Sequence, residues 1–365
     1  MTALANQGWP NAIFLMTLSL PPSPDPSETP GTPSGLAPSR PSESARQIVD
    51  VHVHLWESLE QLGAEAARRI RQRFVTQPWD QPDVSVQALD QAMEPVRYAI
   101  VLGLDCGYVG ASIPCQQVAR YVARQPEKYL GFAGIDPMAS GYLSNLRTAV
   151  DLGLVGVTVS PAAGGYHPSD SRAMRLYEHC QEMNLPVVVH PGTHFAGSAK
   201  LEYSQPYLYD EVARIFPGLR LVLGGVGLPW AEQAIIMIGK HPTCYADLSD
   251  LASRPWQLYN VLLLAYQQGV MDRLLFGSDF PFTTPQTAIH NIYSVNTITH
   301  GTHLPTIPRE QLRRVVERDA LACLGLKPPF QSLDPATGQP TNTQTPTDAL
   351  TPETPATGSV GSATA

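Results

Sequence analysis

Short apolar runs of strand length alternate with longer amphipathic segments along most of this chain, and loops with Gly or Pro separate them. The predicted strands are Ile48–Val53, Tyr98–Leu104, Leu130–Ile135, Leu154–Ser160, Pro186–His190, Leu219–Gly224, Cys244–Leu248 and Leu274–Ser278. The predicted helices are Ser58–Phe74, Val84–Met93, Pro114–Arg124, Tyr142–Leu152, Ser171–Met183, Tyr207–Phe216, Trp230–Gly239, Trp256–Gln268 and Arg309–Leu324.

This alternation predicts the fold class. Nearly continuous apolar strands separated by helices indicate a parallel sheet that is covered on both faces. Eight such units in roughly 280 residues are what a (β/α)₈ TIM barrel needs. The alternative is a doubly wound open sheet, but no glycine-rich phosphate loop follows the first strand. No linker-like stretch interrupts residues 46–328, so we expect a single barrel domain there.

The two ends differ in composition from the barrel. Residues 1–45 and 329–365 are rich in Pro, Ser, Thr and Gly, and such segments bury too little apolar surface to offset the entropy of ordering. We predict that both tails are disordered. The tails carry −2 and −3 of the formal net charge of −8, which leaves the barrel near −3. A domain without a basic excess is not expected to bind nucleic acid.

Cysteine usage and hydropathy bear on the compartment. The five cysteines are widely spaced and form no C-x-x-C pair, which is typical of a reduced, cytoplasmic protein. The apolar run Ala12–Met16 is far too short to span a bilayer, so no membrane association is expected. A secretory signal at this run is the alternative, although no Lys or Arg precedes it.

The first predicted strand carries polar side chains in an unusual pattern. Asp50, His52 and His54 occupy every second position of IVDVHVHLW and alternate with valines. In a regular strand these three side chains would share one face. Burying them without partners would cost roughly 2 kcal/mol or more per group. A divalent cation shared by the histidines would satisfy them, and Asp50 could accept a ring N–H. Ordinary hydrogen bonds are the alternative.

Other polar residues follow later strands. Thr158 and Ser160 end the fourth strand, His190 ends the fifth, and Asp279 follows the eighth. A closed barrel brings the carboxyl ends of its strands together, with the first strand beside the eighth. Three imidazoles and one carboxylate would then suit Zn²⁺, and also Mn²⁺ or Fe²⁺; this predicted ligand set is His52, His54, His190 and Asp279. A core or capping role for His190 and a turn-capping role for Asp279 are the alternatives.

The motifs D-x-H-x-H, V-V-x-H-x-G and L-F-G-S-D-x-P, in this order, resemble the amidohydrolase superfamily. The chain is similar to its branch of aminocarboxymuconate-semialdehyde decarboxylase-like enzymes and small metal-dependent hydrolases, over Gln47 to Leu326. The resemblance implies that the three histidines bind a metal and that Asp279 binds metal and handles protons. Barrels of this branch are often dimers, so the resemblance leaves a homodimer open.

The sequence departs from the family pattern at two positions. Where the fourth strand often carries a Lys that bridges two metals, this chain has Thr158, which argues for a single metal ion. Where the sixth strand typically ends in a histidine, this chain has Gly225 in LVLGGVG. His194 and His167 are candidates to replace that histidine, with hydrogen bonding within their loops as the alternative for each.

Three functions follow from these residues. We expect a hydrolase with one divalent ion, most simply Zn²⁺, that activates water to cleave an amide, ester or lactone of a small molecule. In this prediction Asp279 and His194 are catalytic, and His167, Thr158 and Ser160 bind substrate. The first alternative is a metal-dependent decarboxylase of an aromatic or unsaturated acid, which an arginine in the pocket would favour. The second is a binding protein that has lost catalysis at Gly225.

Overall fold

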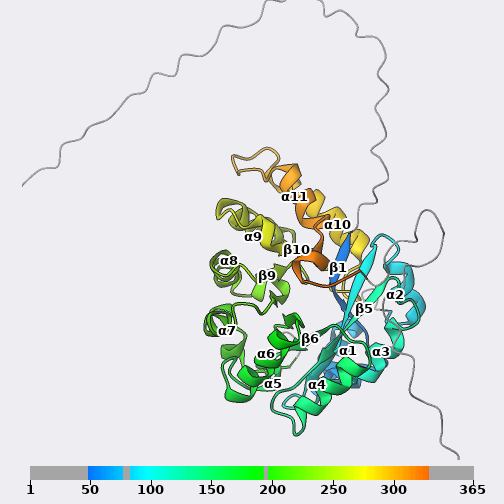
Figure 1. Cartoon of the computed structure of the whole chain (residues 1–365). Coiled ribbons are helices and arrows are strands. Elements are labelled where there is room, and N and C mark those ends of the chain that lie inside the picture. Colours follow the sequence, from blue (N-terminus) through cyan, green and yellow to red (C-terminus); the bar gives the residue numbers. More distant parts are fainter. Residues whose placement is uncertain (1–47, 77–82, 193–195, 329–365) are drawn as a thin grey trace, which may run out of the picture. The chain divides into compact units, whose positions relative to one another are not determined.

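The computed structural model describes residues 48–76, 83–192 and 196–328 (Figure 1). The tails predicted to be disordered lie outside the described residues, as does His194. No helix in the described ranges has the length and hydropathy that a transmembrane segment needs.

Eight parallel strands form one sheet whose order follows the sequence. In this order the strands are β1 (Val49–His54), β2 (Tyr98–Leu102), β5 (Tyr129–Gly134), β6 (Gly156–Val159), β7 (Val187–Val189), β8 (Leu221–Leu223), β9 (Cys244–Asp247) and β10 (Leu274–Leu275). The last strand returns to the first, because the Val51 N–H donates to the Phe276 carbonyl at 3.0 Å and the His54 N–H to the Phe280 carbonyl at 2.8 Å. The predicted barrel is therefore confirmed, and the open doubly wound sheet is excluded.

Helices surround the strands, as Figure 1 shows. The α-helices are α1 (Ala64–Thr76), α2 (Val86–Ala92), α3 (Cys115–Val122), α4 (Tyr142–Asp151), α5 (Pro161–Gly164), α6 (Ser171–Glu182), α7 (Tyr209–Ile215), α8 (Ala231–Lys240), α9 (Pro255–Gln267), α10 (Pro285–Tyr293), α11 (Arg309–Val316) and α12 (Ala320–Cys323). Short 3₁₀ turns are η1 (Leu59–Leu62), η3 (Leu201–Ser204), η4 (Pro206–Leu208), η5 (Gly224–Gly227), η6 (Met271–Arg273) and η7 (Val295–Thr299).

Several predicted elements differ in detail from the structure. Helix α1 begins at Ala64, after a 3₁₀ turn, and not at Ser58, and α10 lies where a loop was expected. The second strand ends at Leu102, and Leu104–Cys106 (β3) instead pairs antiparallel with Ala111–Ile113 (β4) in a small hairpin. The last predicted helix is interrupted, because Asp319 caps the start of α12 by accepting a hydrogen bond from the Ala322 N–H at 3.0 Å. Sequence periodicity alone did not indicate the hairpin or the break.

Two apolar layers hold the barrel together. One cluster joins residues from strands all around the ring, which places it in the barrel interior, and α12 adds Ala320, Leu321 and Leu324 to it. A larger cluster lies between the strands and the surrounding helices. The interior is thus packed toward α12, while the strand carboxyl ends open into a cavity of about 1010 Å³.

Candidate metal centre and active-site cavity

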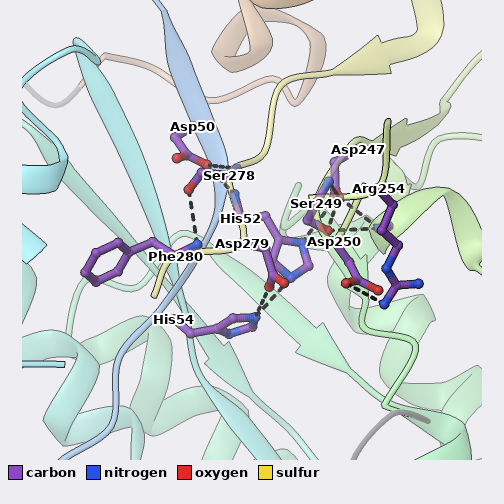
Figure 2. A network of polar contacts seen from close by, with 11 residues as sticks. Asp50, His52, His54, Asp247, Ser249, Asp250, Arg254, Ser278, Asp279 and Phe280 are labelled. Carbon is purple, nitrogen blue, oxygen red and sulfur yellow. Dashed lines mark hydrogen bonds and ion pairs between the residues drawn. The ribbon is translucent and has the colours of Figure 1, made fainter. Parts of the chain in front are cut away.

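The first strand does not alternate regularly. The pairing of β1 with β2 shifts register between Asp50 and Val53, as at a β-bulge. As a result Val51 packs in the barrel interior and Val53 in the outer layer, although the two residues are two apart. Figure 2 shows Asp50 turned away from the rings of His52 and His54. The prediction that all three polar side chains share one face is therefore wrong for Asp50.

Asp50 connects β1 to the loop after β10. Its Oδ1 accepts hydrogen bonds from the backbone N–H groups of His52 at 3.2 Å and Ser278 at 3.0 Å. The Ser278 hydroxyl accepts from the Phe280 N–H at 3.1 Å. This chain of contacts fixes the turn that carries Asp279. Burial raises the pKa of Asp50 to about 6, against the lowering effect of its hydrogen bonds with Ser278.

Three histidines converge at the carboxyl ends of β1 and β7. Ring nitrogens of His52, His54 and His190 lie within 4.8 Å of one another. The Nε2 atoms of His52 and His54 are 3.2 Å apart, close to the roughly 3.4 Å expected for two nitrogens on one tetrahedral ion with bonds of about 2.1 Å. The donor set and its spacing therefore fit one divalent metal ion, as predicted from the sequence.

Asp279 completes this group. Its Oδ1 lies 3.2 Å from His54 Nε2, and both side chains are largely shielded from solvent. The backbone of Asp279 is left-handed, with φ of 63°, a conformation that Asp tolerates better than most residues. Its N–H donates to the His52 carbonyl at 3.0 Å, which anchors it beside β1. Asp279 is thus placed to act as a fourth ligand or a proton carrier.

Asp247, at the end of β9, is the residue that orients His52. Its Oδ2 lies 2.9 Å from His52 Nδ1, which leaves Nε2 directed at His54. Its Oδ1 accepts from the Gly225 N–H at 2.9 Å and from the Ser249 hydroxyl at 2.5 Å (Figure 2). The partner of the His52 ring is therefore not Asp50, which was expected from the sequence, but Asp247. The motif C-Y-A-D-L-S was its only signal.

The pKa values of His52 and His54 are shifted in opposite directions. Burial alone would lower the pKa of His52, but the charge and hydrogen bond of Asp247, with smaller effects from Asp279 and Asp50, raise it to about 9. Burial and the neighbouring His52 lower the pKa of His54 to about 3. His54 is therefore neutral at pH 7, whereas a metal ion that bound His52 would have to displace a proton.

The cavity above the histidines has two kinds of wall. Apolar side chains form one part: Trp56, Leu62, Val109, Ile113 and Phe282. The rings of Trp56 and Phe282 lie 5.8 Å apart. Polar residues after β9 form another part, namely Ser249, Asp250, Ser253 and Arg254. Arg254 is bound to Asp250 at 2.9 Å, and Arg69 adds a second guanidinium to the cavity.

The other predicted site residues lie elsewhere. Thr158 and Ser160 are fully buried in and after β6 and are not among the residues that line the cavity. His167 is exposed, contacts Ser169 through Nδ1 and packs edge-on against Tyr203. His194 is outside the described residues. The proposed roles of these four residues stay predictions.

Similar proteins were found among curated sequences and solved structures. A 2-amino-3-carboxymuconate-6-semialdehyde decarboxylase from Dictyostelium discoideum is 22% identical over 160 residues, which are 40% of this chain and 44% of that protein. The chain thus spans less than half the length of this relative.

Two solved structures share the fold. An uncharacterized TIM-barrel protein from Bordetella bronchiseptica has a TM-score of 0.59 and 19% identity, over 76% of this chain and 99% of that one. A dihydroxybenzoic acid decarboxylase from Polaromonas, with bound manganese and the inhibitor 2-nitroresorcinol, has a TM-score of 0.51 and 15% identity, over 76% and 97%. At such identities these likenesses show the fold alone.

The family comparison covers the whole barrel. The amidohydrolase family model matches residues 49–326, from the first residue of β1 to just beyond α12. This range includes the three histidines, Asp247 and Asp279. The chain therefore belongs to the amidohydrolase family.

Proposed function

We propose that this protein is a metal-dependent decarboxylase that releases CO₂ from a small carboxylic acid. The observation that carries the proposal is the presence of Arg254 and Arg69 in the same cavity as the histidine cluster. Guanidinium groups bind carboxylates strongly, and a neutral ester or lactone would not need them. The decarboxylases among the similar proteins support this choice over the hydrolase expected from the sequence.

The donor set determines which residues would hold the metal. His52, His54 and His190 would supply nitrogens and Asp279 an oxygen, a set suited to Zn²⁺ and acceptable to Mn²⁺. Asp247 would keep the His52 ring in the tautomer that binds through Nε2. A bound divalent ion would supply a positive charge that fixes and polarises the reacting carboxylate.

Asp279 would supply the proton, and apolar side chains would hold the substrate. Asp279 stands at the edge of the cluster and lines the cavity, so its carboxyl group can carry a proton from solvent to the substrate. The reaction balances as R–COO⁻ plus H⁺ giving R–H plus CO₂, with the proton placed on the carbon that CO₂ leaves. The wall around Trp56 and Phe282 would hold the hydrocarbon part and exclude water.

The test compares two reactions on one preparation. Protein loaded with Mn²⁺ or Zn²⁺ is assayed for CO₂ release from hydroxybenzoic acids and unsaturated dicarboxylic acids, and for hydrolysis of aryl esters and lactones. We expect CO₂ release that a chelator abolishes and that His190→Ala loses. His303→Ala, an exposed histidine outside the cavity, is the matched control.

The other outcomes identify the alternatives. Metal-dependent ester or lactone hydrolysis without CO₂ release would overturn the proposal in favour of the hydrolase. Neither reaction from a fully metal-loaded protein would favour the binding protein.

A further inference from the structure

Where the family typically has a histidine, this chain has Gly225, which lines the same cavity as the histidine cluster and Arg254. Gly225 lies just after β8, lines the cavity and has a left-handed φ of 55°. A Cβ placed there would point at Ser249 and Asp250, with the Ser249 carbonyl at 3.3 Å and the Asp250 Cβ at 4.0 Å. A side chain at this position would therefore fill the region in front of the loop that follows β9.

The loop after β9 is hydrogen-bonded to the backbone of Gly225. The Gly225 N–H donates to Asp247 and, at 3.0 Å, to the Ser249 hydroxyl, so the glycine backbone is tied to the loop. Asp250 follows with a left-handed φ of 62° and accepts a hydrogen bond from the Arg254 guanidinium. Figure 2 shows Ser249, Asp250 and Arg254 grouped on the side of His52 opposite to Asp50.

Arg254 is suited to bind an anion in this space. Its guanidinium has five N–H donors, of which the described contacts engage one with Asp250 at 2.9 Å and one with Gln257 at 3.4 Å. Arg254 is 37% exposed, so its ion pair with Asp250 is in contact with solvent and contributes little to stability. A ligand carboxylate can therefore share or replace Asp250 at small cost.

We propose that the space beside Gly225 is a subsite for a second anionic group of the substrate, bound by Arg254. The inference rests on the proposed function, because it assumes that the reacting carboxylate sits at the histidine cluster. It assigns the substrate to carboxylic acids with a second carboxylate or similarly charged group.

Equilibrium binding tests the subsite without turnover. Isothermal titration on metal-loaded protein compares benzoate with benzene-1,3-dicarboxylate, which differ by one carboxylate. We expect the dianion to bind at least tenfold more tightly, the size of one charge-assisted bidentate contact. Arg254→Met should abolish this preference, and Arg254→Lys should retain part of it.

Controls separate this site from general charge effects. Arg175→Met removes the same charge from the exposed face of α6 and should keep the preference. Metal content and thermal melting establish that each variant is folded and loaded.

Several results would overturn the inference. These are equal or undetectable binding of the two acids by wild type, a preference that survives Arg254→Met, or a preference that Arg175→Met removes. Failure of the proposed function is a separate result: an Arg254-dependent preference without CO₂ release from any acid would leave the subsite intact and exclude the decarboxylase.

Discussion

The two sides of the cavity floor are built in opposite ways. The metal side consists of His52, His54, His190 and Asp279, the predicted metal ligands, which come from the ends of β1 and β7 and from the loop after β10. On the side of β8 and β9, the expected histidine is Gly225, and loop residues Ser249, Asp250 and Arg254 line the wall. In the proposed function, the metal side provides the chemistry and the β8–β9 side selects the substrate.

Left-handed backbone occurs on both sides, at Asp279 on the metal side (φ of 63°) and at several residues of the β8–β9 side. The strand-one histidines belong to a hydrogen-bonded strand, so their positions are set by the sheet. The β8–β9 side contains Gly225 at φ of 55°, Val226 at 50° and Asp250 at 62°. A left-handed valine costs about 1–3 kcal/mol and persists only where its surroundings hold it. Such strain often accompanies functional loops, which agrees with a role in ligand selection.

The largest effect is expected from breaking the metal side. His52→Ala removes a ligand and the partner of Asp247, so metal content should fall from about one ion per chain to near zero and CO₂ release by roughly a thousandfold or more. Elemental analysis and the CO₂ assay measure both. His303→Ala should match wild type. Full metal content in His52→Ala would show that the ligand assignment is wrong.

A smaller effect is expected where the two sides meet, at Asp247. Asp247→Asn keeps an oxygen for Gly225 and Ser249 but removes the charge that orients His52, so metal affinity should fall about 10- to 100-fold. Competition with a fluorescent chelator measures the affinity. Asp272→Asn, at an exposed carboxylate paired with Arg273, is the matched control and should have no effect. An unchanged affinity in Asp247→Asn would separate Asp247 from the metal centre.

The next prediction concerns how metal affinity depends on pH, which distinguishes His52 from His54. Because the pKa of His52 is raised to about 9, its ring holds a proton that a metal ion must displace throughout the neutral range. Affinity should therefore rise about tenfold per pH unit from pH 6 to pH 8. His54, with its pKa lowered to about 3, adds no such dependence. A flat profile from the same chelator competition would contradict a protonated His52.

The smallest effect is expected at Asp50, which connects β1 to the loop after β10. Burial raises the pKa of Asp50 from 3.8 to about 6, so the ionised carboxylate is disfavoured in the folded protein, and stability is lost as pH rises from about 4 through 6. Asp50→Asn keeps an acceptor for the Ser278 N–H and removes this cost. Urea unfolding of metal-free protein should show a gain of about 1–2 kcal/mol at pH 7.5 that vanishes near pH 4. A loss of stability at pH 7.5 would contradict this account.

Local sequence was enough to predict the architecture and which polar side chains cluster at the strand ends. Apolar runs and amphipathic segments predicted eight parallel strands with their intervening helices, because side-chain periodicity follows directly from backbone geometry. The barrel then placed His52, His54, His190 and Asp279 together, because the carboxyl ends of its strands meet at one end. Departure from the family pattern at Gly225 was also visible in the sequence alone.

Only the tertiary structure decided how this centre is supported and what faces it. The bulge in β1 turns Asp50 away from the rings, a register change that strict alternation cannot predict. The ring partner of His52 is Asp247, which lies 195 residues away, and sheet pairing and barrel closure bring it there. Arg254 enters the cavity because of the loop conformation after β9. These contacts join distant segments, and no local sequence pattern records which segments will be neighbours.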